Sequence, residues 1–235
     1  WQKIWDGPCF TYEYHFFHQI YRDPGNMYIS RRIYEDIISL DEIGLSGIVE
    51  DGTQRGFFPN GFAMYIYAAA LLNKNCDYEK VTEDYFLHAY GEHWKEVKQY
   101  LDCISELFDF PYMEGEKSAD CTEGKFYNPR QLDKLQQVAD KTGKMRQLAE
   151  RNKSLPIRVQ TVSMRLLLRH TEYCEMLAEL MSAIAVGDKE ESRRLWKKMC
   201  DNFGRYEIEM ERYYDHTLAM RALRAILIDL VSDIE

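Results

Sequence analysis

The segment that most constrains the fold is the nonamer Phe10–His18, in which nearly every residue is aromatic or β-branched. Residues of these types fit the pleated surface of a β-strand, whose successive side chains point to opposite faces. The alternation gives an aromatic face (Phe10, Tyr12, Tyr14, Phe16) and a polar face (Thr11, Glu13, His15). We expect helices to cover the aromatic face, and we expect the polar face to line a cleft or to bind partners.

The residues after this strand complete a strand–helix–strand unit. Residues 23–25 (Asp-Pro-Gly) indicate a turn, and the apolar spacing over 28–43 predicts a helix that Gly44 ends. Leu45–Val49 is short, apolar and partly β-branched, which predicts a second strand. Such a unit makes the two strands parallel with a right-handed crossover, and ligands bind beyond the carboxyl ends of parallel strands. We therefore expect a site formed by the residues at and after these two ends.

Composition limits the classes of protein that the chain can belong to. With 235 residues, of which 46% are hydrophobic, the chain can bury a proper core. A net charge of −9 argues against nucleic acid and anionic membrane as partners. The sequence has no apolar run of about 18 residues that would span a membrane, and residues 1–8 lack the apolar region of a signal peptide. Because two parallel strands are not a stable sheet by themselves, we expect the carboxyl part of a longer protein.

The remainder of the chain reads as helices. Phe62–Leu72 is apolar nearly all round, so we expect it to be buried on every side. The expected class is mainly α with a short βαβ start. The expected organisation is a βαβ segment in 1–60, helices packing on it in 61–112, a boundary loop in 113–127 and a helical bundle in 128–235.

The cysteine and histidine residues follow no ligand pattern. The six cysteines are spaced widely and irregularly, and the six histidines lack the spacing of a metal site. We therefore expect neither a metal nor a cofactor. An even number of cysteines permits disulfide bonds but does not require them.

Several short motifs occur in a fixed order between residues 10 and 112. The motifs are Glu13-Tyr14-His15, Asp23-Pro24-Gly25, Glu35-Asp36-Ile37, Gly44-Leu45-Ser46-Gly47, Phe57-Phe58-Pro59-Asn60-Gly61, Asp84-Tyr85-Phe86 and Ala89-Tyr90-Gly91. In this order they resemble the DUF4838 family of bacterial, mostly extracytoplasmic proteins. Members of that family look like glycoside hydrolases in which a TIM-type barrel is followed by helices. The resemblance covers a little under half of the chain.

The resemblance implies an architecture, a partner and a location. The first strand would be one of the last strands of a barrel, the second strand would close it, and the upstream barrel segment of the same protein would supply the rest. The implied ligand is carbohydrate, and the implied location is periplasmic or secreted. The family has no settled reaction that transfers to this chain.

Under that resemblance the strand ends become a candidate glycan site. Hydrolysis of a glycosidic bond needs two carboxyl groups that face it, and a barrel lumen would turn the polar face of the first strand toward substrate. Core packing is the expected role of Tyr14. The predicted site residues are Glu13 and Glu50 as catalytic carboxylates, with His15, Asp51, Gln54, Phe57 and Phe58 as substrate-binding residues.

Two interpretations remain open at this point. In the first, the chain is the carboxyl-terminal portion of a carbohydrate-active protein, inactive as a hydrolase by itself, and Glu13, His15 and Glu50 converge in a cleft. In the second, it is a non-catalytic helical module for interaction or structural support, and these side chains lie far apart or are fully bonded. The positions of the three side chains distinguish the two interpretations.

Overall fold

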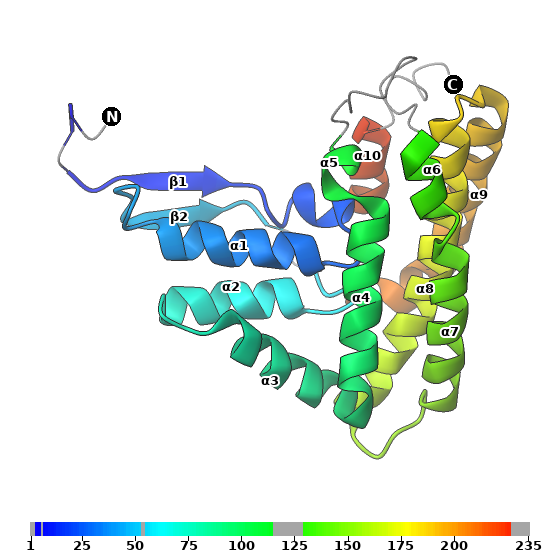
Figure 1. Cartoon of the computed structure of the whole chain (residues 1–235), viewed down its shortest axis with the longest axis horizontal. Helices are drawn as coiled ribbons and strands as arrows, with labels where there is room; N and C mark the ends of the chain where they lie inside the picture. The colour runs from blue at the N-terminus through cyan, green and yellow to red at the C-terminus, as the bar shows by residue number, and fades with distance from the viewer. Residues whose placement is uncertain (1–2, 6, 53–54, 115–128, 227–235) are drawn as a thin grey trace.

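The computed structural model describes residues 3–5, 7–52, 55–114 and 129–226 (Figure 1). As the sequence predicts, this part of the chain is mainly α-helical, and its sheet consists of two parallel strands, β1 (Phe10–Glu13) and β2 (Gly47–Glu50). The α-helices are α1 (Met27–Ser39), α2 (Phe62–Leu72), α3 (Tyr78–Tyr90), α4 (Trp94–Phe108), α5 (Phe110–Met113), α6 (Pro129–Leu135), α7 (Val138–Arg151), α8 (Arg158–Ala185), α9 (Lys189–Met210) and α10 (His216–Ile226), with 3-10 turns η1 (Gln19–Arg22) and η2 (Gly91–His93).

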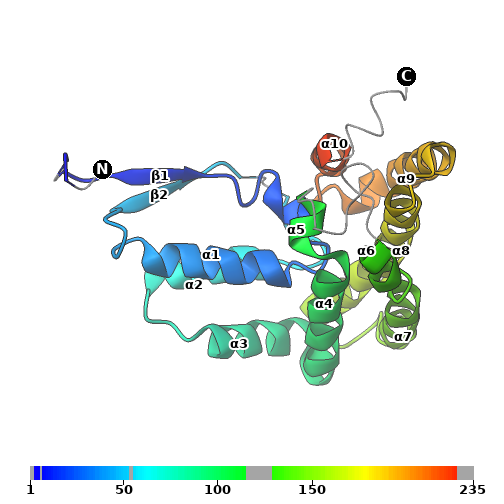
Figure 2. The ribbon, with the colours of Figure 1, turned by 45° about the horizontal axis from the view of Figure 1, so that its top comes forward.

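The elements form layers that leave one face of the sheet open. Helix α1 packs along one face of β1 and β2, α2 lies beside α1, and α3 follows α2 (Figures 1 and 2). Helix α4 connects these layers to a group of long helices, α7, α8 and α9. In Figure 2 no helix of the described chain covers the opposite face of the sheet.

Strand β1 is shorter than the nonamer suggested, and its uncovered face is the aromatic one. The ladder ends at Glu13, after which the chain turns, with Phe17 N–H donating to Tyr14 C=O at 3.1 Å. Phe10, Tyr12 and Tyr14 are 68%, 51% and 47% exposed. The expected helical cover over these three rings is therefore wrong, because the crossover helix α1 packs against the face of Thr11 and Glu13 instead.

The bounds of helix α2 are predicted correctly, but its environment is not. Helix α2 has the predicted bounds, and the Asp77 carboxylate caps α3 by accepting from the N–H groups of Glu79 and Lys80. The prediction that α2 is buried on every side is wrong, since Tyr65 and Leu72 on this helix are exposed. A charge-free sequence gives no indication of which side of a helix its neighbours leave uncovered.

The two ends of the chain share one hydrophobic core. Buried residues from α1 to α4 and from α6 to α10 form a single cluster. The loop after β2 also bonds directly to the segment before α10, where Phe57 N–H donates to Tyr213 C=O at 2.8 Å and Arg55 pairs with Asp215 at 2.5 Å. Most of the expected boundary loop 113–127 lies outside the described residues. The helices after this loop pack as one body with the strand–helix layers.

Candidate functional site at the strand ends

His15 joins three elements at the point where the strands end. Its Nδ1 lies 2.9 Å from Glu50 Oε2 at the end of β2, and its Nε2 lies 2.9 Å from Asp36 Oδ2 on α1. The imidazole is 2% exposed. The second oxygen of the Glu50 carboxylate accepts from Phe16 N–H at 3.3 Å. Two of the predicted site residues, His15 and Glu50, are thus in direct contact.

The charge state of His15 follows from these contacts. Burial alone would lower its pKa, but the hydrogen bonds to Asp36 and Glu50 and their negative charges outweigh burial and raise the pKa to about 9. At neutral pH both ring nitrogens therefore donate a proton to a carboxylate. Glu50, whose side chain is 10% exposed, serves here as the counter-ion of a buried imidazolium.

The raised pKa of His15 predicts a pH-dependent stability. Because the folded pKa lies above the ordinary value of 6.5, the contribution is fully present below pH 6.5 and is lost as pH rises through about 9. The shift corresponds to a loss on the order of 3 kcal/mol. Denaturant titrations at pH 6, 8 and 10 should show this loss in the wild type and a flatter profile in His15→Gln. Parallel pH profiles of the two proteins would contradict the assignment.

Glu13 does not take part in the contacts between His15 and Glu50. It is the ladder partner of Glu50, but its carboxylate accepts a hydrogen bond from the Thr11 hydroxyl at 2.5 Å. Both side chains lie on the half-buried face of β1 that α1 covers. Glu13, His15 and Glu50 thus cluster at the strand ends, but all three are hydrogen-bonded on the covered side of the sheet. This is the arrangement expected of the second, non-catalytic interpretation.

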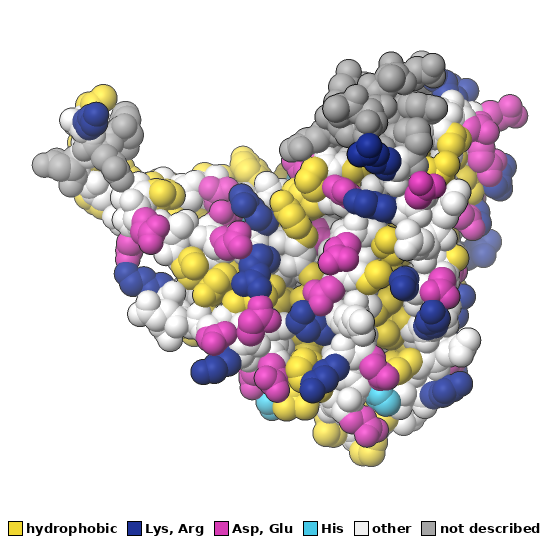
Figure 3. All heavy atoms as spheres, in the orientation of Figure 1, with side chains coloured by type: hydrophobic (Ala, Val, Ile, Leu, Met, Phe, Trp, Pro, Cys, Tyr) yellow, Lys and Arg dark blue, Asp and Glu magenta, His cyan; other side chains and the backbone are white. Residues whose placement is uncertain are grey.

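The open face carries a second group of side chains. Tyr12 and Tyr14 lie 5.2 Å apart between ring centroids, and Phe17 lies 6.0 Å from Tyr14. Asp51 directly follows β2, and the pKa of Tyr12 is raised first by partial desolvation and then by the negative charge of Asp51. Figure 3 shows uncovered apolar side chains along the strands. The rings and one carboxylate therefore meet solvent at the carboxyl ends of both strands.

The loop residues that were expected to stack on sugars separate into two environments. Phe57 is 40% exposed, whereas Phe58 is buried and its ring packs near His170, Tyr173 and Tyr214. The position of Phe58 in the core leaves no ring face for a ligand. Gln54 lies outside the described residues.

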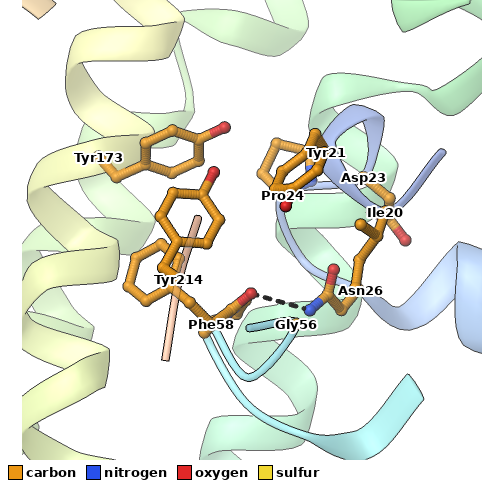
Figure 4. A pocket seen from close by; sticks show the side chains of 10 residues that line it. Ile20, Tyr21, Asp23, Pro24, Asn26, Gly56, Phe58, Tyr173 and Tyr214 are labelled. Carbon is orange, nitrogen blue, oxygen red and sulfur yellow. Dashed lines mark hydrogen bonds between the residues drawn. The ribbon is translucent and has the colours of Figure 1, made fainter. Parts of the chain in front are cut away.

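A small cavity beside Phe58 lies where the strand–helix layers meet the long helices. Figure 4 shows Tyr173 and Tyr214 on one side and Tyr21 with Pro24 on the other, and Asn26 Nδ2 donates to Phe58 C=O at 3.2 Å. The cavity volume of about 10 Å³ suits at most one water molecule. It is too small for a substrate.

The sequence did not lead us to predict that Tyr12 and Tyr14 lie on the surface. The available signal was Asp36, one of the charged residues between the apolar positions of the predicted helix. A carboxylate on the crossover helix is a natural partner for an imidazole on the strand that it covers. That pairing would have placed His15 under α1 and turned Tyr12 and Tyr14 outward.

The fold and the site define a mainly helical protein with an open pair of parallel strands that presents aromatic rings. Comparisons of the chain with protein-family models, with curated proteins and with solved structures gave no match. No group of three or more His, Cys, Asp or Glu side chains in the described part is placed to hold a metal ion. None of its helices is long and apolar enough to cross a membrane.

Proposed function

We propose that this chain binds carbohydrate on the open face of β1 and β2, as the carboxyl-terminal part of a glycoside-hydrolase-like protein of the DUF4838 type. The observation that carries the proposal is the run of exposed rings beside Asp51 at the strand ends. Aromatic rings provide flat apolar surface for the C–H faces of sugars, and a carboxylate accepts hydrogen bonds from their hydroxyl groups. Tyr12, Tyr14 and Asp51 are the residues proposed to bind the glycan.

The position of α1 supports a barrel as the surrounding architecture. In a TIM barrel the helices lie outside, so the strand face without a helix is the lumen. Here that face belongs to Tyr12, Tyr14 and Val49, and not to Glu13 and His15. Strands of parallel sheets are normally covered on both faces, which supports further strands from the upstream segment of the same protein. In line with the family resemblance, we place this protein outside the cytoplasm.

The engagement of the two predicted catalytic carboxylates favours binding over hydrolysis by these residues. Glu50 neutralises His15, and Glu13 bonds to Thr11 on the covered side of the sheet. A general acid or base must reach the proton that it transfers. We therefore propose that the acid and base of any hydrolysis lie in the upstream barrel segment, and that this chain contributes binding surface.

A binding titration with one aromatic substitution tests the proposal. Isotope-labelled protein is titrated with maltohexaose, cellohexaose and chitohexaose while backbone amide signals are followed by NMR. We expect at least one sugar to shift the amides around Tyr14 and Asp51, and we expect Tyr14→Ala to lower the affinity about tenfold through loss of ring stacking. Tyr65→Ala is the matched control, because Tyr65 is similarly exposed on α2, away from the sheet face. Equal losses in both variants, or no shift with any of the sugars, would contradict the proposal.

A further inference from the structure

The side chain of His15 ties together the two segments that present the proposed glycan-binding residues. Tyr14 directly precedes His15, and Asp51 directly follows Glu50, the residue that His15 pairs with. We infer that His15 is a positioning residue, whose ion pairs hold Tyr14 and Asp51 in the arrangement that binds the ligand. This inference rests on the proposed carbohydrate site.

The ladder geometry explains why one side chain has this influence. Regular pairing of the strands stops at Glu13 and Glu50, just before Tyr14 and Asp51. Beyond that point, Asp51 N–H still donates to Glu13 C=O at 2.9 Å, and the Glu50 carboxylate bonds both to the His15 ring and to Phe16 N–H. The contacts of Glu50 with residues 15 and 16 therefore define how the chain leaves β1 relative to the end of β2.

The charged groups around the His15 ring make the positions of Tyr14 and Asp51 depend on whether the imidazole is protonated. Asp36 approaches from α1 and Glu50 from β2. Arg32 on α1 lies 4.0 Å from the other oxygen of Asp36, and Tyr67 on α2 has its pKa raised by burial and by the charge of Glu50. When the imidazole of His15 is neutral, it has only one N–H group to donate to the carboxylates of Asp36 and Glu50. The two negative charges are then no longer neutralised, and they repel each other.

The two carboxylates that bond to the His15 ring differ in how they contact the rest of the site. Substituting each of them in turn therefore gives a matched pair of variants. Glu50 is adjacent to Asp51 and contacts the backbone of the turn, whereas Asp36 holds the ring from the helix side and is 41% exposed with Arg32 nearby. We expect Glu50→Gln to disturb the presentation of Tyr14 and Asp51, and we expect Asp36→Asn to disturb it far less. A purely structural role for His15 predicts similar effects from both.

An NMR titration of the free protein tests positioning without any sugar. Between pH 7 and 9.5, the Asp51 amide and the Tyr14 ring signals should move with the same midpoint as the His15 imidazole. In His15→Gln the same signals should stay constant over this range. If His15→Gln does not fold, Glu50→Gln and Asp36→Asn give the comparison instead. Signals of Tyr14 and Asp51 that ignore the titration of His15, and that respond alike to both carboxylate variants, would overturn the inference.

A binding measurement then separates this inference from the proposed function. With a hexasaccharide that the wild type binds, Glu50→Gln should lower the affinity about tenfold, as expected for a displaced binding group, while Asp36→Asn should stay close to wild type. If no hexasaccharide binds the wild type, the proposed function fails and the titration of the free protein still decides the positioning role. Sugar binding that is equal in both variants would leave the proposed function standing and overturn the role of His15.

Discussion

Replacing Phe58 with alanine is expected to lower the free energy of unfolding by about 3–5 kcal/mol. The Phe58 ring is buried between the loop after β2 and the helical half, with ring centroids 4.7 Å from Tyr214 and 5.9 Å from Tyr173. Removing the ring leaves a cavity enclosed by side chains from distant parts of the chain. These side chains cannot easily move in to fill the cavity, so most of the cost of the cavity remains. Denaturant titration followed by far-UV circular dichroism measures the loss.

The neighbouring ring provides the control for this substitution. Phe57 is 40% exposed, so Phe57→Ala should cost well under half as much as Phe58→Ala. Because one core cluster joins the strand–helix layers to the long helices, tryptophan fluorescence, to which the buried Trp196 on α9 contributes, and circular dichroism should report the same transition. Separate transitions, or equal losses for the two phenylalanines, would show that Phe58 does not couple the halves.

Replacing Leu177 with alanine is expected to cost about 2–5 kcal/mol. Leu177 is fully buried in the middle of α8, a helix that packs against α7 on one side and α9 on another. Val159, near the start of the same helix, is 53% exposed, so Val159→Ala should change the free energy of unfolding by about 0.5 kcal/mol or less. A loss below half a kcal/mol for Leu177→Ala would mean that the buried face of α8 is assigned wrongly.

The two faces of one short sheet have separate roles in this interpretation. The covered face builds the fold through the contacts of His15 with α1 and β2, and the open face exposes the rings that we propose bind the glycan together with Asp51. Successive residues of a strand point to opposite faces, so the residues of the two faces share one short stretch of backbone. The buried charge of His15 on the covered face can therefore influence binding on the open face. The pH dependence of stability and that of binding should then share one origin, the proton on His15.

Several local elements of this protein can be predicted from its sequence alone. Helix α2 has its predicted bounds, and the carboxylates of Asp77 and Asp188 cap α3 and α9. The parallel pairing of β1 with β2 also followed from the order strand–helix–strand. These features depend on hydrophobic periodicity and on side chains that bond within a few residues, and both are visible in a single stretch of sequence.

The covered and open faces of the strand are set by tertiary packing. Alternation defines two faces, but it does not say which one the crossover helix covers. That choice depends on contacts of His15 with Asp36 and Glu50, which lie 21 and 35 residues away. The single core depends in the same way on Phe58 meeting Tyr173 and Tyr214 across the fold. Each of these contacts forms only when distant segments pack, so no local pattern specifies it.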